Sequence, residues 1–188
     1  MLIRILAFLL ETFFFVLIGA ALLRAWMNGC RVNMRSQPGS FVMAVTDWIV
    51  RPLRRVLPKA WAQSRIDWAS VVSATALALM YALVWAVLFG VLAGTGELTV
   101  FGPTALLPLL VFAVKMLVRV ALQTAMVLVF GFAILSWVQP GSSVYSLLGR
   151  LTEPLLAPLR RVIPTIGGVD LSALALILIL QIGLMIFG

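Results

Sequence analysis

The segment TDWIVRPLRRVLP, from Thr46 to Pro58, returns as TEPLLAPLRRVIP, from Thr152 to Pro164. Seven of the thirteen aligned positions are identical, and four more exchange residues of the same chemical type. Each copy lies between two long apolar runs. Repetition of this kind marks a duplicated structural unit. The sequence therefore predicts two tandem halves, residues 1–97 and 98–188, each made of two apolar segments joined by a basic loop.

The apolar runs predict membrane-spanning helices. The chain is 63% hydrophobic and only 11% charged, whereas ordinary soluble domains carry about 25% charged residues. A bilayer core of about 30 Å is crossed by roughly 20 apolar residues in a helix. Four candidate spans are Ile5–Trp26, Trp68–Ala93, Phe112–Val138 and Val169–Phe187. The predicted class is an all-α membrane protein: four transmembrane helices in two two-span repeats, each repeat with a cytoplasmic amphipathic helix at the interface.

The stretch before the third span is harder to assign. Residues 98–138 are too many for one span, and Pro103, Pro108 and the basic pair Lys115 and Arg119 interrupt them. We therefore expect Leu106–Val114 to form an interfacial or re-entrant lead-in.

The placement of basic residues predicts the topology. Ten of the fourteen Lys and Arg residues lie in the two loops that carry the repeated motif. Cytoplasmic loops are enriched in Lys and Arg, and translocated loops are depleted in them. Both motif loops are therefore expected in the cytoplasm and both termini on the opposite side. The net charge of +8 is then a signal of topology and of anionic lipid, and nucleic acid is not an expected partner.

The composition gives little support to an enzyme. The chain has no histidine, a single cysteine and six carboxylates. Histidine is the commonest general base and a frequent metal ligand. No catalytic, cofactor-binding or metal site is predicted.

The repeated motif predicts a short basic amphipathic helix. In the second copy Thr152 is the expected N-cap, and Pro154 falls where a missing N–H is harmless. The proline pair Pro52 and Pro158 is expected to break each helix into two short turns. Such helices lie flat among lipid headgroups. The candidate lipid- or partner-docking residues are Arg51, Arg54, Arg55, Arg160 and Arg161; alternatively, these arginines only enforce the orientation of the chain.

Two aspartates follow the motifs. Asp67 and Asp170 directly precede the second and fourth spans. A carboxylate there caps exposed N–H groups and meets the positive end of the helix dipole. The alternative is that each aspartate pairs with a motif arginine.

The doubled PLRRVLP and PLRRVIP, with GGVDLS after the second copy, resembles the YggT family of bacterial integral membrane proteins. The resemblance covers nearly the whole chain and implies the bacterial inner membrane. With the charge distribution above, the termini are then expected in the periplasm. It also implies loose links to membrane-complex assembly, envelope organisation and osmotic tolerance, without a biochemical activity.

Small residues recur at every fourth position of the second span. A stripe of this kind lets another helix approach closely in lipid. The candidate packing residues are Ala74, Ala78, Ala82, Ala86, Gly90 and Gly94; alternatively, the stripe reflects only composition.

Two opposite charges are predicted at similar membrane depth. Glu11 lies fifteen residues before Trp26, and Arg119 lies eighteen before Trp137. A helical rise of 1.5 Å per residue places them about 22 and 27 Å from these tryptophans. We expect the two side chains to point into the bundle and to pair, either as a structural salt bridge or as a polar site for an ion or proton.

Two functional hypotheses follow. The first is a non-enzymatic membrane scaffold or assembly factor that binds anionic lipid and a membrane-protein partner, or a second copy of itself, through its basic helices. The second is a small oligomeric channel or transporter subunit built around Glu11 and Arg119.

Overall fold

The computed structural model describes residues 1–34, 38–56, 67–92, 106–163 and 171–187. Within these ranges all regular elements are helices, as predicted. They are α1 (Leu2–Gly29), α2 (Gly39–Val56), α4 (Trp68–Leu92), α5 (Leu106–Val138), α6 (Ser143–Arg160) and α7 (Leu171–Phe187). Both halves have the same order of elements. In each half an 18-residue helix, α2 or α6, lies between two apolar helices.

Three of the described helices are long and apolar enough to cross a membrane. They are α1, the Trp68–Leu88 part of α4, and α5. The apolar helix α7 has 17 residues, which correspond to a length of about 25 Å. The structure thus supports three candidate spans and a shorter fourth apolar helix.

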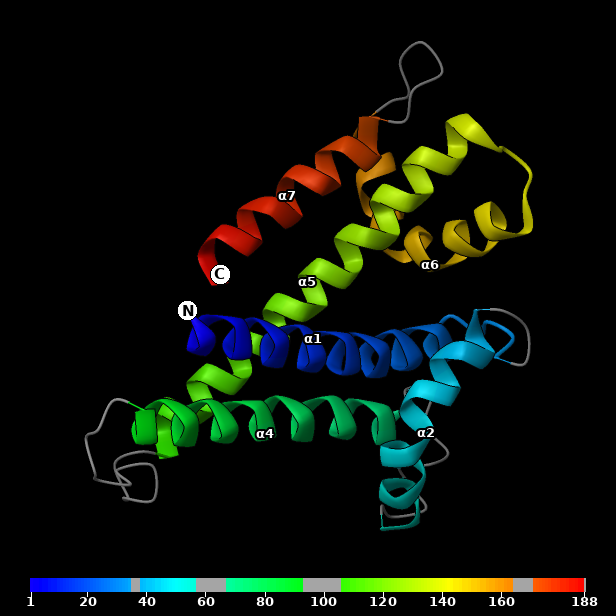
Figure 1. The fold of residues 1–188 in the computed structure, drawn as a ribbon. Helices are drawn as coiled ribbons and strands as arrows, with labels where there is room; N and C mark the ends of the chain where they lie inside the picture. Colours follow the sequence, from blue (N-terminus) through cyan, green and yellow to red (C-terminus); the bar gives the residue numbers. More distant parts are fainter. Residues whose placement is uncertain (35–37, 57–66, 93–105, 164–170, 188) are drawn as a thin grey trace.

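The helices are arranged as two crossing layers (Figure 1). Helices α1 and α4 lie side by side and run in opposite directions, and α5 crosses them obliquely. Helix α7 packs along the second half of α5, and α6 packs against both. Both chain termini are at the left of Figure 1, whereas α2 and α6 are at the right.

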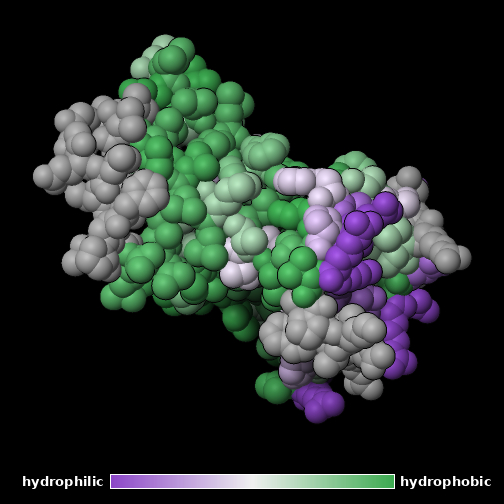
Figure 2. Space-filling view, turned by 90° about the horizontal axis from the view of Figure 1, so that it is seen from below, coloured by the Kyte–Doolittle hydropathy of each residue, from purple (hydrophilic) through white to green (hydrophobic). Residues whose placement is uncertain are grey.

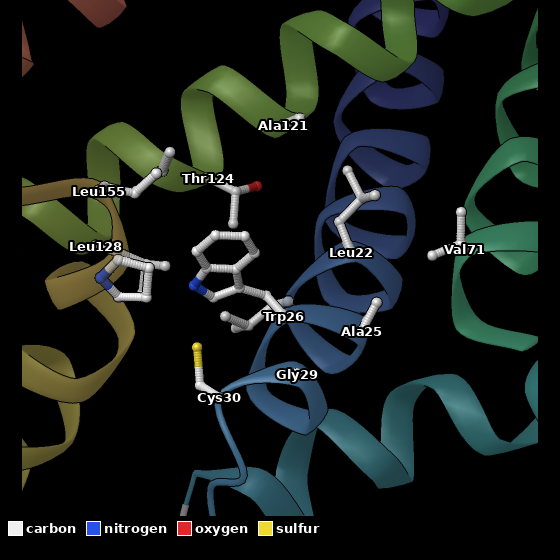
Figure 3. Close-up of a pocket in the computed structure, with 13 residues that line it drawn as sticks. Leu22, Ala25, Trp26, Gly29, Cys30, Val71, Ala121, Thr124, Leu128 and Leu155 are labelled. Carbon is white, nitrogen blue, oxygen red and sulfur yellow. The ribbon is translucent and has the colours of Figure 1, made fainter. Parts of the chain in front are cut away.

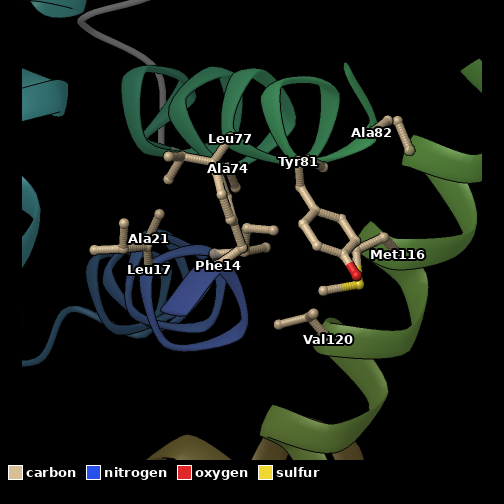
Figure 4. Packing of buried hydrophobic residues seen from close by; sticks show 12 residues of the cluster. Phe14, Leu17, Ala21, Ala74, Leu77, Tyr81, Ala82, Met116 and Val120 are labelled. Atoms are coloured by element: carbon tan, nitrogen blue, oxygen red, sulfur yellow. The ribbon is translucent and has the colours of Figure 1, made fainter. Parts of the chain in front are cut away.

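The main core joins α1, α4 and α5 (Figure 4). Phe14 of α1 lies beside Leu77 of α4, and Met116 and Val120 of α5 lie beside Tyr81. Ile18 belongs to the same buried cluster. Tyr81 is 3% exposed and its ring lies 5.4 Å from that of Phe14. A second core joins α5, α6 and α7 around Val129, Leu156 and Leu176. The oblique helix α5 therefore contributes to both.

The small residues of α4 lie in the first core. Ala74, Ala78 and Ala82 are at most 2% exposed and belong to the cluster formed with α1. Ala86 is partly buried. Gly90 lies within α4, and Gly94 is outside the described residues. Packing through the first three alanines brings α1 and α4 together along this stripe.

This packing gives a first prediction. Replacing Ala78 with isoleucine inserts a branched side chain where α1 packs on α4. Overpacking of this kind destabilises a core by about 1–3 kcal/mol. A lower thermal midpoint in detergent is expected, whereas the control V87I should change it little, because Val87 is 37% exposed. Equal midpoints for both variants would mean that the stripe is only compositional.

The expectation that Leu106–Val114 forms a separate lead-in before the third span is wrong. Helix α5 is continuous from Leu106 to Val138. Pro108 is its third residue, and an N–H in the first turn has no intrahelical acceptor to lose. Its 33 residues extend over about 50 Å, which is longer than a bilayer core.

The expected start and breaks of the motif helices are also wrong. Helix α6 begins after Ser142, whose hydroxyl accepts from the N–H of Tyr145. Thr152 lies in mid-helix and is fully buried, and its hydroxyl donates to the Leu148 carbonyl at 2.8 Å. The prolines break neither helix. Val50 and Leu156 beside them are completely buried, so packing stabilises each helix despite the lost hydrogen bond.

Candidate functional site

A buried arginine organises the end of the molecule where α1, α2 and α4 meet. Arg24 lies on the face of α1 that also buries Ala21 and Ala25, and it is only 6% exposed. Its Nη1 donates to Thr46 Oγ1 and to Asp47 Oδ1, each at 2.8 Å. A buried guanidinium needs such partners, since an isolated charge is strongly disfavoured away from water.

A second carboxylate completes this charged cluster. Asp67 directly precedes α4, and its carboxylate accepts from Arg54 Nη2 at 2.8 Å and from the Ser70 hydroxyl at 2.9 Å. Arg24 Nε lies 3.9 Å from the same carboxylate oxygen. In the first repeat, Asp67 therefore pairs with the motif arginine Arg54, as the second of the two interpretations of this aspartate expected. Asp67 also begins α4, because its carbonyl accepts from the N–H groups of Ser70 and Val71.

Arg51 adds a third guanidinium, with its Nη2 2.7 Å from Asp47 Oδ2. Burial by itself would raise the pKa of the Asp47 carboxyl. The hydrogen bond and charge of Arg24, together with Arg51, outweigh burial and hold the pKa below its usual value. The carboxylate of Asp47 is thus ionised at neutral pH.

The cluster contains three arginines and two aspartates, namely Arg24, Arg51, Arg54, Asp47 and Asp67. These five groups carry one net positive charge. They join one apolar helix from each side of the loop to the basic helix between them. We define these five residues as the Arg24 cluster.

Sequence reasoning missed Arg24. In the sequence it is one more basic residue at the end of an apolar run. Its partner Asp47 is 23 residues away, so the spacing along α1 does not indicate the pair. The available signal was a carboxylate in the motif and another before α4, which together need a nearby cation.

The second repeat has a different arrangement. When Trp26 and Trp137 are aligned, Leu135 takes the place of Arg24. Glu153, the counterpart of Asp47, pairs instead with Arg160 at 2.7 Å, and both side chains are accessible. The Arg160 guanidinium also lies 6.0 Å from the centre of the Phe132 ring. Asp170, the second predicted cap, is outside the described residues.

The predicted docking arginines are accessible at the surface, including the two that belong to the Arg24 cluster. The side chains of Arg51 and Arg54 are 75% and 50% exposed, and Arg55 and Arg161 are exposed. The opposite face of α2 is buried through Val42, Thr46 and Val50. Space filling shows the strongly hydrophilic residues gathered at one end of a largely apolar surface (Figure 2).

Glu11 and Arg119 come together in the structure. Arg119 Nη1 lies 3.2 Å from Glu11 Oε1, and the two side chains are 40% and 41% exposed. The pair borders a recess of about 200 Å³ that also contacts Thr12, Met116 and Gln123.

The expectation that the Glu11–Arg119 pair points into the bundle is wrong. It lies at the edge of the contact between α1 and α5. Val120 is fully buried, and the next residue along a helix is turned by about 100°. Arg119 therefore projects beside the buried face and not into it.

Comparison with known proteins gives one consistent match. A family model described as CCB3/YggT matches residues 1–88 and 111–188, one segment in each half. The chain is 34% identical over 182 residues to "Uncharacterized protein YggT" of Escherichia coli strain K12, covering 94% of this chain and 86% of that protein. It is 32% identical over 183 residues to "Uncharacterized protein in proC 3'region" of Vibrio alginolyticus, covering 97% and 92%. No solved structure gives a significant match.

Proposed function

The chain belongs to the CCB3/YggT family, as the doubled motif predicted, and we propose that it is a non-enzymatic scaffold or assembly factor of the bacterial inner membrane. In this proposal α1, α4, α5 and α7 span the bilayer. The basic helices α2 and α6 lie among the cytoplasmic headgroups, where they bind anionic lipid and a membrane-protein partner.

The gathering of basic residues at one end of an apolar molecule carries the proposal. Helices α2 and α6 share one side of Figure 1, and the chain termini share the other. The basic side therefore corresponds to the cytoplasm, where Lys and Arg are enriched. The 17 residues of α7 are at the lower limit for a spanning helix, and the longer α5 fits the same bilayer when tilted.

The Arg24 cluster supports a docking role for α2. It joins α2 to α1 through Asp47 and to α4 through the Arg54–Asp67 contact. A helix held in this way presents its exposed arginines in a fixed arrangement. Each basic residue near an anionic leaflet contributes on the order of 1 kcal/mol, so a fixed set of them selects anionic headgroups.

The second prediction tests docking. The double variant R55Q/R161Q removes one exposed charge from each motif and leaves the Arg24 cluster intact. We expect the preference for phosphatidylglycerol over phosphatidylcholine to weaken by about tenfold or more, because two contributions on the order of 1 kcal/mol are lost. Spin-labelled lipids in reconstituted vesicles measure this preference. Adducts to a partner protein, formed by a photo-crosslinker at the exposed Val56, should also decrease in cells.

The matched control is R4Q/K115Q, which removes two exposed charges from the other end. An equal loss of preference in test and control would leave only general electrostatic attraction and would contradict docking through α2 and α6.

The Glu11–Arg119 pair favours a second candidate, a small oligomeric channel or transporter subunit. Its support is an ion pair beside a recess on an otherwise apolar surface. Ionisable residues within membrane segments often mark ion or proton pathways. For this candidate, E11Q should abolish an ion or proton flux in vesicles, whereas a scaffold should retain partner crosslinking in that variant.

A further inference from the structure

An apolar pocket of about 530 Å³ lies between the two repeats (Figure 3). Its walls come from α1 and α4 of the first repeat and from α5 and α6 of the second. Leu22 and Trp26 form one side, and Ala121, Ala125 and Leu128 form another. Its size is within the range of small-molecule sites, roughly 300–1,000 Å³.

The indole N–H and the hydroxyl on the wall are already bound within the protein, and the weakly polar thiol of Cys30 also lines the space. Trp26 Nε1 donates to the Leu151 carbonyl at 2.9 Å, and Thr124 Oγ1 donates to the Val120 carbonyl at 2.7 Å. The indole ring itself lies in the middle of the pocket (Figure 3). These contacts leave hydrocarbon facing the space, so its occupant must be apolar where it touches the wall.

The pocket is reached from outside the protein. Ala121, Pro154 and Gly29 line it and are exposed. It reaches from Cys30, just after the C-terminal end of α1, to Ala121 near the middle of α5. An occupant that enters from the bilayer can thus place its apolar part along α5 and its polar part at the headgroup level.

Two arginines are close in sequence to residues at the Cys30 end of the pocket. Arg31 directly follows Cys30, and Arg150 directly precedes Leu151, whose carbonyl accepts from Trp26. Arg150 is also four residues before Pro154, a spacing that places two residues on one side of a helix. Both arginines are exposed. This distribution of charge complements an anionic headgroup above a hydrocarbon chain.

We propose that this pocket binds one acyl chain of an anionic phospholipid from the surrounding bilayer, with the phosphate group held by Arg31 and Arg150. The lipid then fills the space between the two repeats and contacts both. An acyl chain gains little hydrophobic free energy on moving from bilayer to pocket, so selection rests on the two charges and on packing. The inference rests on the proposed orientation of the chain in the membrane.

The test uses the full-length chain in vesicles that contain phosphatidylglycerol with a photoreactive group in its acyl chain. Photolysis and mass spectrometry locate the adducts. We expect adducts on the segment that contains Ala121 and Ala125 and on that around Cys30. A125F fills the pocket and should remove most of them. V127F adds the same bulk at a residue that is 67% exposed and should retain them.

The double variant R31Q/R150Q tests the two arginines that are proposed to hold the phosphate. The preference of the adducts for phosphatidylglycerol over phosphatidylcholine should decrease by about tenfold or more, since two contributions of about 1 kcal/mol are lost. The control R4Q/K115Q should leave this ratio unchanged. If A125F does not fold, A121F at the exposed entrance replaces it.

Three outcomes would overturn the proposal. They are equal adducts in A125F and V127F, equal yields from the two lipids in the unmodified chain, and adducts to a protein or a second copy in place of lipid. If one of these outcomes is found while R55Q/R161Q still weakens the preference for phosphatidylglycerol, the pocket is rejected as a lipid site. The proposed docking role of α2 and α6 is then retained.

Discussion

Replacing Arg24 with leucine is expected to destabilise the protein by about 3–5 kcal/mol, the usual result of removing one partner from a buried charged pair. Asp47 and Asp67 would then face each other without the guanidinium that lies 2.8 Å from one and 3.9 Å from the other. The thermal midpoint in detergent should be much lower than that of the unmodified chain. Leucine is the natural residue at the corresponding Leu135, so a leucine is compatible with an apolar helix in this protein.

The matched control is R51L. Arg51 also pairs with Asp47, but its side chain is 75% exposed, and exposed pairs contribute about 0–1 kcal/mol. Neutralising the carboxylates in the triple variant R24L/D47N/D67N should recover part of the stability lost in R24L. If R24L and R51L are equally stable, Arg24 is not the organising residue of the cluster.

Breaking the Glu11–Arg119 pair is expected to have the second largest effect. With α1 and α5 as membrane spans, as proposed, either single variant, E11L or R119L, leaves one charge on an apolar surface inside the bilayer. Insertion scales assign roughly 3 kcal/mol to such a charge at the centre of a span, and about 40% of each side chain is exposed. The measurement is the yield of correctly inserted, folded protein and its thermal midpoint.

A double-mutant cycle with the exchanged charges isolates the pair itself. The single variants E11R and R119E each bring two like charges together, and the exchange E11R/R119E should recover stability that each of them loses, because the two residues are 3.2 Å apart. Neighbouring residues couple in this way, whereas independent residues add. Additive losses in the exchange variant would show that Glu11 and Arg119 act separately.

The features that were predicted correctly are those that depend on local patterns of residues along the sequence. Apolar length located α1, α4 and α5, and the repeat predicted the same element order in each half. Depth along two helices was enough to bring Glu11 and Arg119 together. These features follow from spacing along one helix or one repeat, which a single sequence displays directly.

The sequence failed where tertiary contacts override a local signal. Thr152 looks like an N-cap, yet packing buries it in mid-helix and its hydroxyl bonds to Leu148. Pro52 looks like a helix break, yet buried neighbours keep α2 continuous. Arg24 contacts partners across a loop, and the two carboxylates that indicate a nearby cation do not say which arginine supplies it. The edge position of Arg119 likewise depends on how α5 crosses α1.

The most direct test of the account is the sidedness of the two ends of the molecule. A topology reporter fused after Gly188, and single cysteines at Arg55 and Arg161 in a Cys30→Ser background, are examined in intact cells and in inverted vesicles. The account predicts a periplasmic reporter, with both cysteines labelled only from the cytoplasmic side. A cytoplasmic reporter, or cysteines that are labelled from opposite sides, would contradict the arrangement of four spans in two parallel repeats.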